Sequence, residues 1–142
     1  MYVFLEKLLV APSELVIFLF FSIASSAEDA MLKNKKITNS EGATRSFSKN
    51  TYNIINSRGF TAKYSKTFHS ISSIAIAGSD TNMQRDYEYS AATHASDLLL
   101  AEKVGSLAAK RAASRLNSKK IKSCTLDVIF EPRVAKSILS SF

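Results

Sequence analysis

The sequence has little of the residues that most often carry chemistry or covalent cross-links: one cysteine, two histidines and no tryptophan. A single cysteine, Cys124, permits no internal disulfide, which favours a reducing compartment. We interpret Cys124, between Ser123 and Thr125 in a predicted strand, as a small packing residue. A reactive nucleophile is the alternative interpretation.

Sequence motifs of common active sites are also missing. The sequence contains no HExxH metal helix, no GxSxG nucleophile elbow, no GxxxxGK[ST] phosphate loop and no GxGxxG dinucleotide loop. His94 and Asp97 have i, i+3 spacing and share a face if a helix starts early, but a zinc site needs further protein ligands close by. Capping and surface roles suit these two residues better. The residues alone therefore predict no catalytic and no cofactor-binding side chain.

Glycine and proline are scarce, with four and two residues, while 46% of the residues are hydrophobic. This composition predicts globular structure rather than disorder. The net charge of +7 at pH 7 makes nucleic acid or another anionic surface a candidate partner. Arg111, Arg115 and Lys119 recur every four residues and could track phosphates, although a solvated helix face has the same pattern.

A long apolar run, residues 15–23, dominates the N-terminal part of the sequence. It resembles the core of a signal peptide, but Glu6 and Glu14 stand where a positive flank is required. A membrane span needs about 20 continuous apolar residues, and residues 12–14 interrupt the run. We therefore predict a buried helix that has Ser13 as its N-cap and turns polar at residues 28–29, with no membrane contact.

The residues from 37 to 77 predict an antiparallel β-meander of about four strands. Its extended segments are residues 37–50, 52–56, 60–68 and 71–77, and Gly59 can supply a positive φ at one of the turns. Apolar and polar residues alternate best from Phe60 to Phe68, which indicates one buried and one solvated face. Residues 83–90 then predict a polar connector. In it, Tyr87 and Tyr89 either pack as an edge strand or stack on a peptide or a base.

A second unit follows this meander. Ser96 or Asp97 is predicted to cap a helix that runs to about Asn117, in which small residues such as Gly105 allow close packing. Its predicted buried stripe consists of Leu100, Val104, Leu107, Ala108 and Ala112. Residues 126–130 predict a short strand, and Pro132 predicts the first turn of another helix. The expected fold class is α+β: an antiparallel meander with a flanking helix, followed by helix, strand and helix.

The last predicted helix is amphipathic and ends the sequence. Its apolar stripe consists of Val134, Ala135, Ile138, Leu139 and Phe142. The helix stops on that stripe, with no glycine C-cap and no following polar segment. We therefore expect the sequence to be a piece of a longer protein.

Five segments, in this order, resemble signatures of the TldD/PmbA family. They are ITNSEGA (37–43), NSRGF (56–60), MQRDYEYS (83–90), AEKVGSLAAKRA (101–112) and VIFEPRV (128–134). Their order and spacing are similar to the family from about Ala27 to Phe142. The resemblance is closest to the PmbA branch, also called TldE, whose members are described as modulators of DNA gyrase and as partners of a TldD metallopeptidase. It implies that residues 1–86 are a remnant of the family's N-terminal domain and that residues 87–142 begin its central domain.

The resemblance also has consequences for catalysis. TldD-type subunits carry an HExxxH zinc helix directly after a strand and cleave unfolded peptides in a cytoplasmic complex. Placing Pro132 on the family's proline puts Ser140 and Ser141 at the approximate positions of the His-Glu pair. Neither serine can replace an imidazole ligand or a carboxylate base at zinc. The resemblance therefore implies a chain with no catalytic residue, no metal ligand and no cofactor of its own, and zinc only in a TldD-like partner.

Three functions remain as hypotheses. The first is a PmbA-like, non-catalytic subunit of a TldD-type zinc metallopeptidase complex, with a TldD-like subunit and a peptide substrate as partners. The second is a basic binding module that modulates DNA gyrase or DNA, which the net charge of +7 suggests. The third is the non-functional product of a decayed gene.

Overall fold

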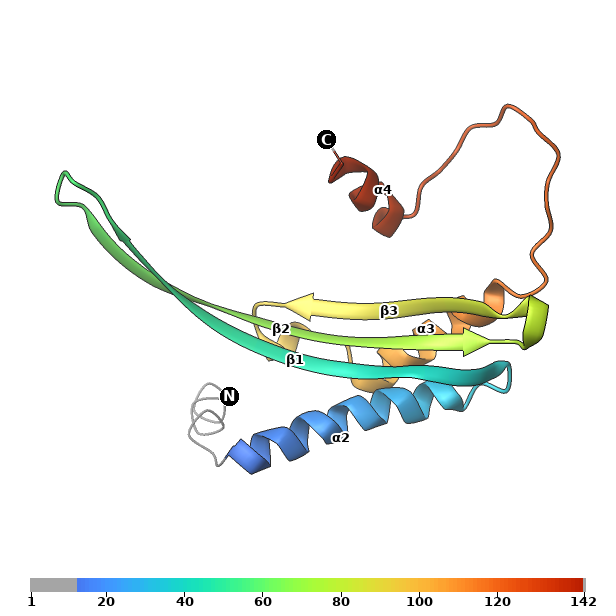
Figure 1. Cartoon of the computed structure of the whole chain (residues 1–142), viewed down its shortest axis with the longest axis horizontal. Helices are drawn as coiled ribbons and strands as arrows, with labels where there is room; N and C mark the ends of the chain where they lie inside the picture. The colour runs from blue at the N-terminus through green and yellow to red at the C-terminus, as the bar shows by residue number, and fades with distance from the viewer. Residues whose placement is uncertain (1–12, 142) are drawn as a thin grey trace.

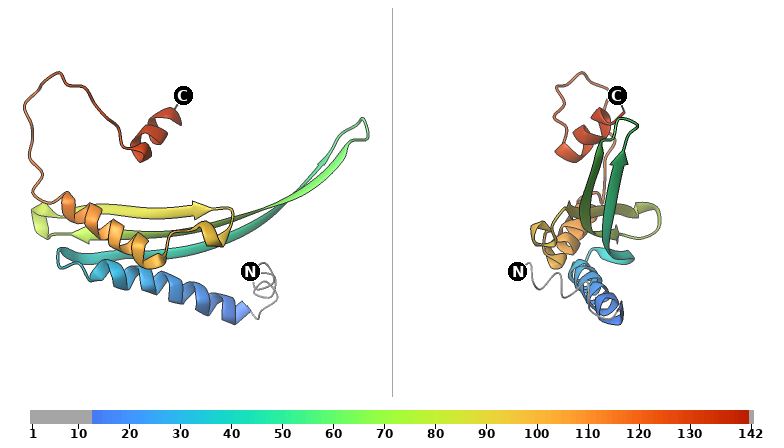
Figure 2. Two further views of the ribbon diagram at one scale, coloured as in Figure 1. Left: turned by 180° about the vertical axis from the view of Figure 1, so that it is seen from behind. Right: turned by 90° about the vertical axis from the view of Figure 1, so that its left-hand side faces the viewer.

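The computed structural model of the chain describes residues 13–141. In chain order its main elements are α2 (Ser13–Leu32), β1 (Ile37–Ile55), β2 (Thr61–Ala77), β3 (Gln84–Ala92), α3 (Ala101–Ser114) and α4 (Pro132–Leu139). Two short 3-10 helices, η1 (Asp80–Asn82) and η2 (Ala95–Asp97), flank β3. The helices α2 and α3 cover one face of an antiparallel sheet, and α4 lies beyond β3, away from α2 (Figures 1 and 2). The predicted α+β class is confirmed.

The sheet has the order β1-β2-β3, and its first two strands are unusually long. They pair from Ile37 opposite Ala77 to Ile55 opposite Thr61, while β3 pairs only with residues 69–77 of β2. The rest of the β1–β2 hairpin projects beyond β3 as a curved ribbon (Figure 1). We call this ribbon, residues 48–68, the arm.

The meander was predicted with about four strands between residues 37 and 77, and the structure corrects this to two, to which β3 adds a third. Segments 37–50 and 52–56 fuse into β1, and segments 60–68 and 71–77 fuse into β2. The polar residues between the segments do not break the strands, because they pair across the hairpin. Thr51 lies opposite Ser65 and their hydroxyls are 2.9 Å apart, while Ser46 lies opposite Ser70.

The tip of the arm forms the turn that the sequence predicts. Gly59 has a φ of +82°, and the side chain of Asn56 accepts hydrogen bonds from the backbone amides of Arg58 and Phe60. A side-chain amide that caps the backbone of the next residues stabilises a tight turn. The positive φ expected at Gly59 is therefore confirmed.

The core between the sheet and the helices is built largely from small side chains. Met31, Ile71 and Val104 are its largest fully buried apolar residues. The other buried apolar residues are Ala27, Ala30, Ile37, Ala75, Ala77, Ala108, Ala109 and Ala112. Gly105 of α3 faces the backbone of α2 so closely that a Cβ atom added there would lie 1.8 Å from the carbonyl oxygen of Ala27. The close packing predicted for Gly105 is therefore confirmed.

The helix predicted from Ser13 is present, but only its C-terminal half is buried. Ala27, Ala30 and Met31 are in the core, whereas Phe18 and Phe21 are each 69% exposed. The expectation that length excludes a membrane span is wrong, because the helix continues through residues 24–31. Within residues 13–141, α2 is long and apolar enough to cross a membrane, a test that core helices and signal sequences also pass.

Helix α3 begins later than predicted. Ser96 and Asp97 do not cap it, because both lie in η2, where the Ser96 hydroxyl donates to the Asp97 carboxylate. Leu100, predicted in the buried stripe, precedes the helix and is 74% exposed. Burial of Val104, Ala108 and Ala112 is confirmed, and Leu107 is partly buried.

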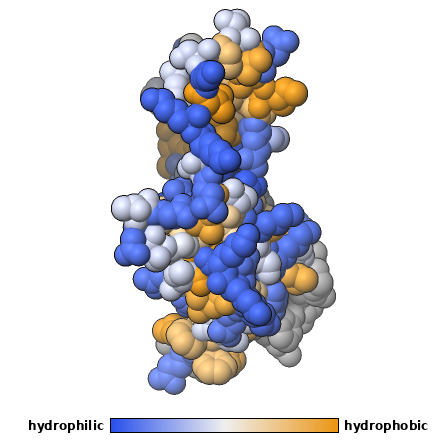
Figure 3. Space-filling view, turned by 90° about the vertical axis from the view of Figure 1, so that its right-hand side faces the viewer, coloured by the Kyte–Doolittle hydropathy of each residue, from blue (hydrophilic) through white to orange (hydrophobic). Residues whose placement is uncertain are grey.

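The strand predicted at residues 126–130 is wrong. These residues belong to an irregular connection from α3 to α4 that pairs with no strand, and Ile129 is 98% exposed. Apolar side chains gather at the end of the molecule where this connection and α4 lie, and again over α2 (Figure 3). Cys124 is exposed in the same connection, so its interpretation as a packing residue is also wrong.

Helix α4 begins at Pro132 as predicted, with proline in its first turn. Val134 and Ile138 of its apolar stripe are 43% and 40% exposed, and no residue of α4 is fully buried. Phe142, the last residue of that stripe, lies outside the described residues.

The structure shows no separation at the expected domain boundary between residues 86 and 87. Strand β3 runs through both residues without a break, and α3 packs on β2, β3 and α2. Residues on both sides of that point therefore share one core, because the sheet needs α3 as well as α2 to cover its buried face.

Candidate functional site: the charged seam between β3, α3 and α4

Alternation along β3 places its side chains on two faces with different chemistry. Asp86 and Glu88 face the helix-covered side of the sheet, opposite Ala75 and Ser73, whose side chains are fully buried. Tyr87 and Tyr89 face the open side, and their rings stack with centroids 6.3 Å apart. From Gln84 onward the predicted connector is an edge strand, and the edge-strand interpretation of the two tyrosines is confirmed.

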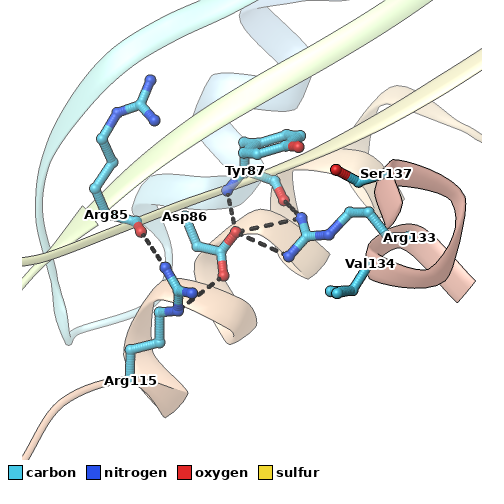
Figure 4. A pocket seen from close by; sticks show the side chains of 7 residues that line it. All are labelled: Arg85, Asp86, Tyr87, Arg115, Arg133, Val134 and Ser137. Carbon is cyan, nitrogen blue, oxygen red and sulfur yellow. Dashed lines mark hydrogen bonds and ion pairs between the residues drawn. The ribbon is translucent and has the colours of Figure 1, made fainter. Parts of the chain in front are cut away.

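Ion pairs join β3 to α3 and to the start of α4, and we call them the seam: they involve Asp86, Glu88, Arg111, Arg115, Glu131 and Arg133. Asp86 is at its centre, and its carboxylate is only 7% exposed. Oδ2 lies 3.3 Å from Nε of Arg115 on α3. Oδ1 accepts from both terminal nitrogens of Arg133 on α4 at 3.3 Å, and from the Tyr87 backbone amide at 2.8 Å. Figure 4 shows the carboxylate between the two guanidinium groups. A buried carboxylate requires such partners, because burial removes the water that otherwise stabilises its charge.

Arg133 holds the start of α4 on the edge of the sheet through more than this ion pair. Its Nη1 donates to the Tyr87 carbonyl at 3.1 Å, and its guanidinium carbon lies 4.8 Å from the centroid of the Tyr87 ring. The planar guanidinium can stack on an aromatic ring while its edge donates hydrogen bonds, which a lysine cannot do. The contact therefore fixes the orientation of α4 as well as its position.

A second charged contact runs parallel to the first. Arg111 of α3 donates from Nε to Glu88 at 2.7 Å and lies 2.8 Å through Nη1 from Glu131, which directly precedes α4. Hydrogen bonds to Glu131 and Glu88 raise the pKa of Arg111 above its ordinary value. Arg111 and Arg115, one helical turn apart, thus bind both carboxylates of β3 and link the strand to α4.

The seam encloses an open cleft of about 280 Å³. It is lined by Arg85, Asp86, Tyr87, Arg115, Arg133, Val134 and Ser137. Arg85 turns its guanidinium away from the others (Figure 4) and donates to Glu41 at 2.7 Å. That hydrogen bond lowers the pKa of Glu41. Each of the three arginines is already bound to a carboxylate, so the cleft is suited to holding α4 in place and offers no nucleophile paired with a base.

Two of the three residues of the stripe that could track phosphates have partners within the protein. Arg111 and Arg115 are bound to carboxylates of β3, so their charges are neutralised within the protein. Lys119 lies beyond the end of α3 and is exposed. A stripe read from i, i+4 spacing alone does not reveal this, because the carboxylates belong to another element.

Ser140 and Ser141 lie at the end of α4, where both side chains are exposed. Their hydroxyls donate to the same backbone carbonyl, that of Ser137, at 2.8 and 3.2 Å. They therefore satisfy the end of their own helix and converge on no common point with an imidazole or a carboxylate. Within residues 13–141, no group of three or more histidine, cysteine, aspartate or glutamate side chains is placed to hold a metal ion. His94 and Asp97 form no such group, and Asp97 belongs to η2.

The seam itself is what the sequence reasoning missed. Asp86 and Glu88 have the i, i+2 spacing that puts two carboxylates on one face of a strand, and Arg111 and Arg115 have the matching i, i+4 spacing on a helix. That complementarity is visible in the sequence once residues 83–90 are taken as a strand. Arg133 had no such signal, because it lies 47 residues from Asp86.

Comparison with known proteins supplies the family. A family model described as the PmbA/TldA metallopeptidase central domain matches residues 10–116. The match extends across residues 86 and 87 and includes most of the stretch that we assigned to the family's N-terminal domain.

Individual relatives agree with this match. A metalloprotease PmbA homolog of Buchnera aphidicola subsp. Baizongia pistaciae is 39% identical over 117 residues, which are 82% of this chain and 26% of the relative. Metalloprotease PmbA of Escherichia coli O157:H7 is 36% identical over 130 residues, or 91% of this chain and 28% of that protein. The chain therefore spans about a quarter of the length of these relatives.

A solved structure shares the fold. It is that of a Thermotoga maritima protein assigned provisionally as a modulator of a DNA gyrase. The TM-score is 0.68 at 24% identity, over 74% of this chain and 24% of that one. With the family model matching three quarters of its residues, the chain belongs to the PmbA/TldD metallopeptidase family.

Proposed function

We propose that this chain acts as a PmbA-like, non-catalytic component of a TldD-type zinc metallopeptidase complex that cleaves peptides in the cytoplasm. In this proposal a TldD-like partner supplies the zinc and the catalytic groups. Membership of a metallopeptidase family and the relatives named metalloprotease PmbA support the peptidase context. The assignment of the catalytic groups to a second subunit rests on the resemblance to the PmbA branch.

The observation that carries the proposal is the chemistry at the end of α4. Zinc in a peptidase needs nitrogen or carboxylate ligands and a general base that activates water. Ser140 and Ser141, which the resemblance puts at the approximate positions of the family's His-Glu pair, offer neutral hydroxyls that already donate to the Ser137 carbonyl. These residues do not fit a zinc site, so we derive no hydrolytic step from them.

The surface of the chain suits a component of a larger assembly. Helix α2 exposes a group of apolar side chains that are 53–69% exposed: Leu15, Ile17, Phe18 and Phe21. Exposed apolar side chains grouped in this way usually mark a contact with another protein. The connection before α4 adds Leu126, Val128 and Ile129, which are also exposed (Figure 3). Two such patches call for a cover, from further segments of a longer protein or from a partner subunit.

Reconstitution tests this function. The chain, a TldD-type subunit and their mixture are compared for co-elution in size-exclusion chromatography, for bound zinc and for chelator-sensitive cleavage of an unfolded peptide. We expect co-elution, and zinc with activity only where the TldD-type subunit is present. Stoichiometric zinc and chelator-sensitive cleavage by the chain alone would overturn the proposal.

A matched pair of variants sharpens the result. Replacing Ser140 and Ser141 by alanine removes both hydroxyls at exposed positions, and we expect the activity of the mixture to stay unchanged. Phe18→Ser and Phe21→Ser change the exposed face of α2 and should weaken co-elution if this face contacts the partner.

Two other functions remain as hypotheses. The basic module acting on DNA or DNA gyrase is favoured by one observation, which is that the sequence contains no aspartate or glutamate from Gly42 to Ser79. The product of a decayed gene would show no cooperative thermal transition by circular dichroism, whereas we expect one because α2, α3 and the sheet share a packed core.

A further inference from the structure

The arm is the part of the molecule that neither the helices nor the ion pairs use. From Ser48 to Thr61 every residue is exposed, and within residues 13–141 no further strand pairs with either edge of the ribbon, because β3 stops at the pair His69–Ala92. Only at its base does Thr67 donate a hydrogen bond to the Thr93 carbonyl, at 2.8 Å. The arm reaches far beyond the end of β3 in Figure 1 and in the left view of Figure 2. A long exposed edge presents unpaired backbone groups that promote aggregation, so natural proteins protect such an edge or pair it with a partner.

The charge of the arm has one sign. Lys49, Arg58, Lys63 and Lys66 lie on it and are exposed, while the nearest carboxylates in the sequence are Glu41 and Asp80. None of these four cations forms an ion pair within the described residues. By contrast, Arg45 at the base donates to the Ser70 carbonyl at 2.9 Å and is not available. The free positive charge of the described sheet is therefore concentrated on the arm.

Strand pairing distributes the four cations around the ribbon. Lys49 lies opposite Thr67 and Lys63 opposite Asn53, which puts both lysines on one face. Lys66 lies opposite Asn50 on the other face, beside the stacked rings of Tyr52 and Tyr64, and Arg58 is in the turn. The uncharged polar side chains between them are serine, threonine, asparagine and tyrosine, all of which can donate hydrogen bonds. The arm also exposes the apolar side chains of Ile54, Ile55, Phe60 and Phe68.

This pattern fits the phosphates of a nucleic acid better than a groove on a protein. Lysine, arginine, serine, threonine, asparagine and tyrosine are the side chains that bind phosphate oxygens, and a ribbon inside a groove has phosphates on both sides. The major groove of duplex DNA, about 12 Å wide, admits a two-stranded β-ribbon. An acidic protein groove would bury one face only and leave the cations of the other face without a partner.

We infer that the arm is a binding site for duplex DNA, with Lys49, Arg58, Lys63 and Lys66 contacting phosphates on both sides of the ribbon. This site is independent of the peptidase role proposed above, since it shares no residue with the seam or with α4. It also moves the DNA-binding hypothesis away from Arg111 and Arg115, which carboxylates of β3 already bind.

A salt titration of the full chain with a short fluorescent duplex tests the inference. The slope of log K against log salt is about −0.9 for each phosphate contact, so four contacts predict a slope of about −3.6. The variant K49Q/K63Q/K66Q should flatten the slope by about 2.7 and weaken binding at least about tenfold at 0.1 M salt. Because all three lysines are exposed, we expect its circular dichroism spectrum and melting temperature to match those of the unchanged chain.

The matched control is K119Q/K120Q/K122Q, which removes the same net charge from exposed residues outside the arm. Binding that survives the control and fails in the arm variant supports the inference. Equal losses in both variants would show that net charge alone attracts the duplex, and would overturn it. No salt-dependent binding by the unchanged chain would overturn it as well.

Two further measurements distinguish DNA from an acidic protein as the ligand and cover the case in which the arm variant does not fold. Polyglutamate that binds the chain more tightly than the duplex, with the same loss in the arm variant, would assign the arm to an acidic protein instead. If the arm variant fails to fold, amide hydrogen exchange of the unchanged chain decides: the duplex should protect residues 48–68, and protection elsewhere without the arm would refute the inference.

Discussion

The arm and the helix-covered part of the sheet belong to the same two strands, yet different forces hold them together. We call α2, α3 and the sheet residues 37–46, 69–77 and 84–92 the body. In the body, small buried side chains let helix and strand backbones approach, as at Ala75, Ala108 and Gly105. In the arm, cross-strand hydrogen bonds and one stacked tyrosine pair, Tyr52 with Tyr64, act without a core. The same pair of strands is therefore packed against helices at one end and exposed to solvent at the other.

The largest effect is expected where two backbones of the body meet. Gly105→Ala places a Cβ atom 1.8 Å from the Ala27 carbonyl oxygen, so α2 and α3 must move apart. We expect a loss of about 3 kcal/mol or more in the free energy of unfolding, measured by urea denaturation. Ser106→Ala, at the exposed next residue, is the control and should stay within about 0.5 kcal/mol. A Gly105→Ala variant as stable as the control would show that the two helices are not in close contact.

The next effect concerns the charges that link the body to α4. Asp86→Asn keeps an acceptor for the Tyr87 amide but removes the charge that Arg115 and Arg133 share. We expect a loss of about 1–3 kcal/mol, and faster amide hydrogen exchange in residues 132–139 than in α3. The control is Glu41→Gln, which removes an exposed ion pair with Arg85 and should leave α4 unchanged. Unaltered exchange in α4 after Asp86→Asn would mean that the seam does not hold this helix.

A smaller effect is expected in the arm. Tyr52→Ala removes a stacked pair whose rings lie 4.8 Å apart, which is worth about 0.5–1.5 kcal/mol. Because the arm can open without the body, the loss should appear as faster exchange of its own amides, with the melting temperature nearly unchanged. Asn53→Ala, on the opposite face of the same strand, is the matched control. A large fall in melting temperature would show that arm and body unfold as one unit.

The smallest effect is a pH dependence at the junction of arm and body. Burial, followed by the charge of Arg45, lowers the pKa of His69 below its ordinary 6.5, and the Arg45 guanidinium lies 3.2 Å from Nδ1. Below pH 6.5 the unfolded chain therefore binds a proton that the folded chain resists, so stability should fall as the pH drops through that range.

Thermal melts between neutral and mildly acidic pH check this prediction. His69→Gln should remove most of the slope, while His94→Gln, which removes only the weakest of the three causes that lower the pKa of His69, should retain most of it. Equal slopes in the unchanged chain and in the His69 variant would assign the pH dependence to other groups.

The seam illustrates how far sequence reasoning reaches. The edge-strand interpretation of Tyr87 and Tyr89 and the helix from Pro132 were available, because alternation and a proline in the first turn are local signals. The strand predicted at residues 126–130 had local apolar residues, but no strand of the described sheet pairs with it. A strand forms only if another strand offers its backbone groups, and no local pattern reports that.

The sequence by itself determined the α+β class, the turn at Gly59, the helices beginning at Ser13 and Pro132, and the family. Each depends on neighbouring residues or on motifs in order along the chain. Only the tertiary structure decided that Asp86 is buried between Arg115 and Arg133 and that Gly105 touches α2. It also decided that the β1–β2 hairpin extends beyond the end of β3. These features depend on residues far apart in the sequence, which packing brings together and local propensity cannot specify.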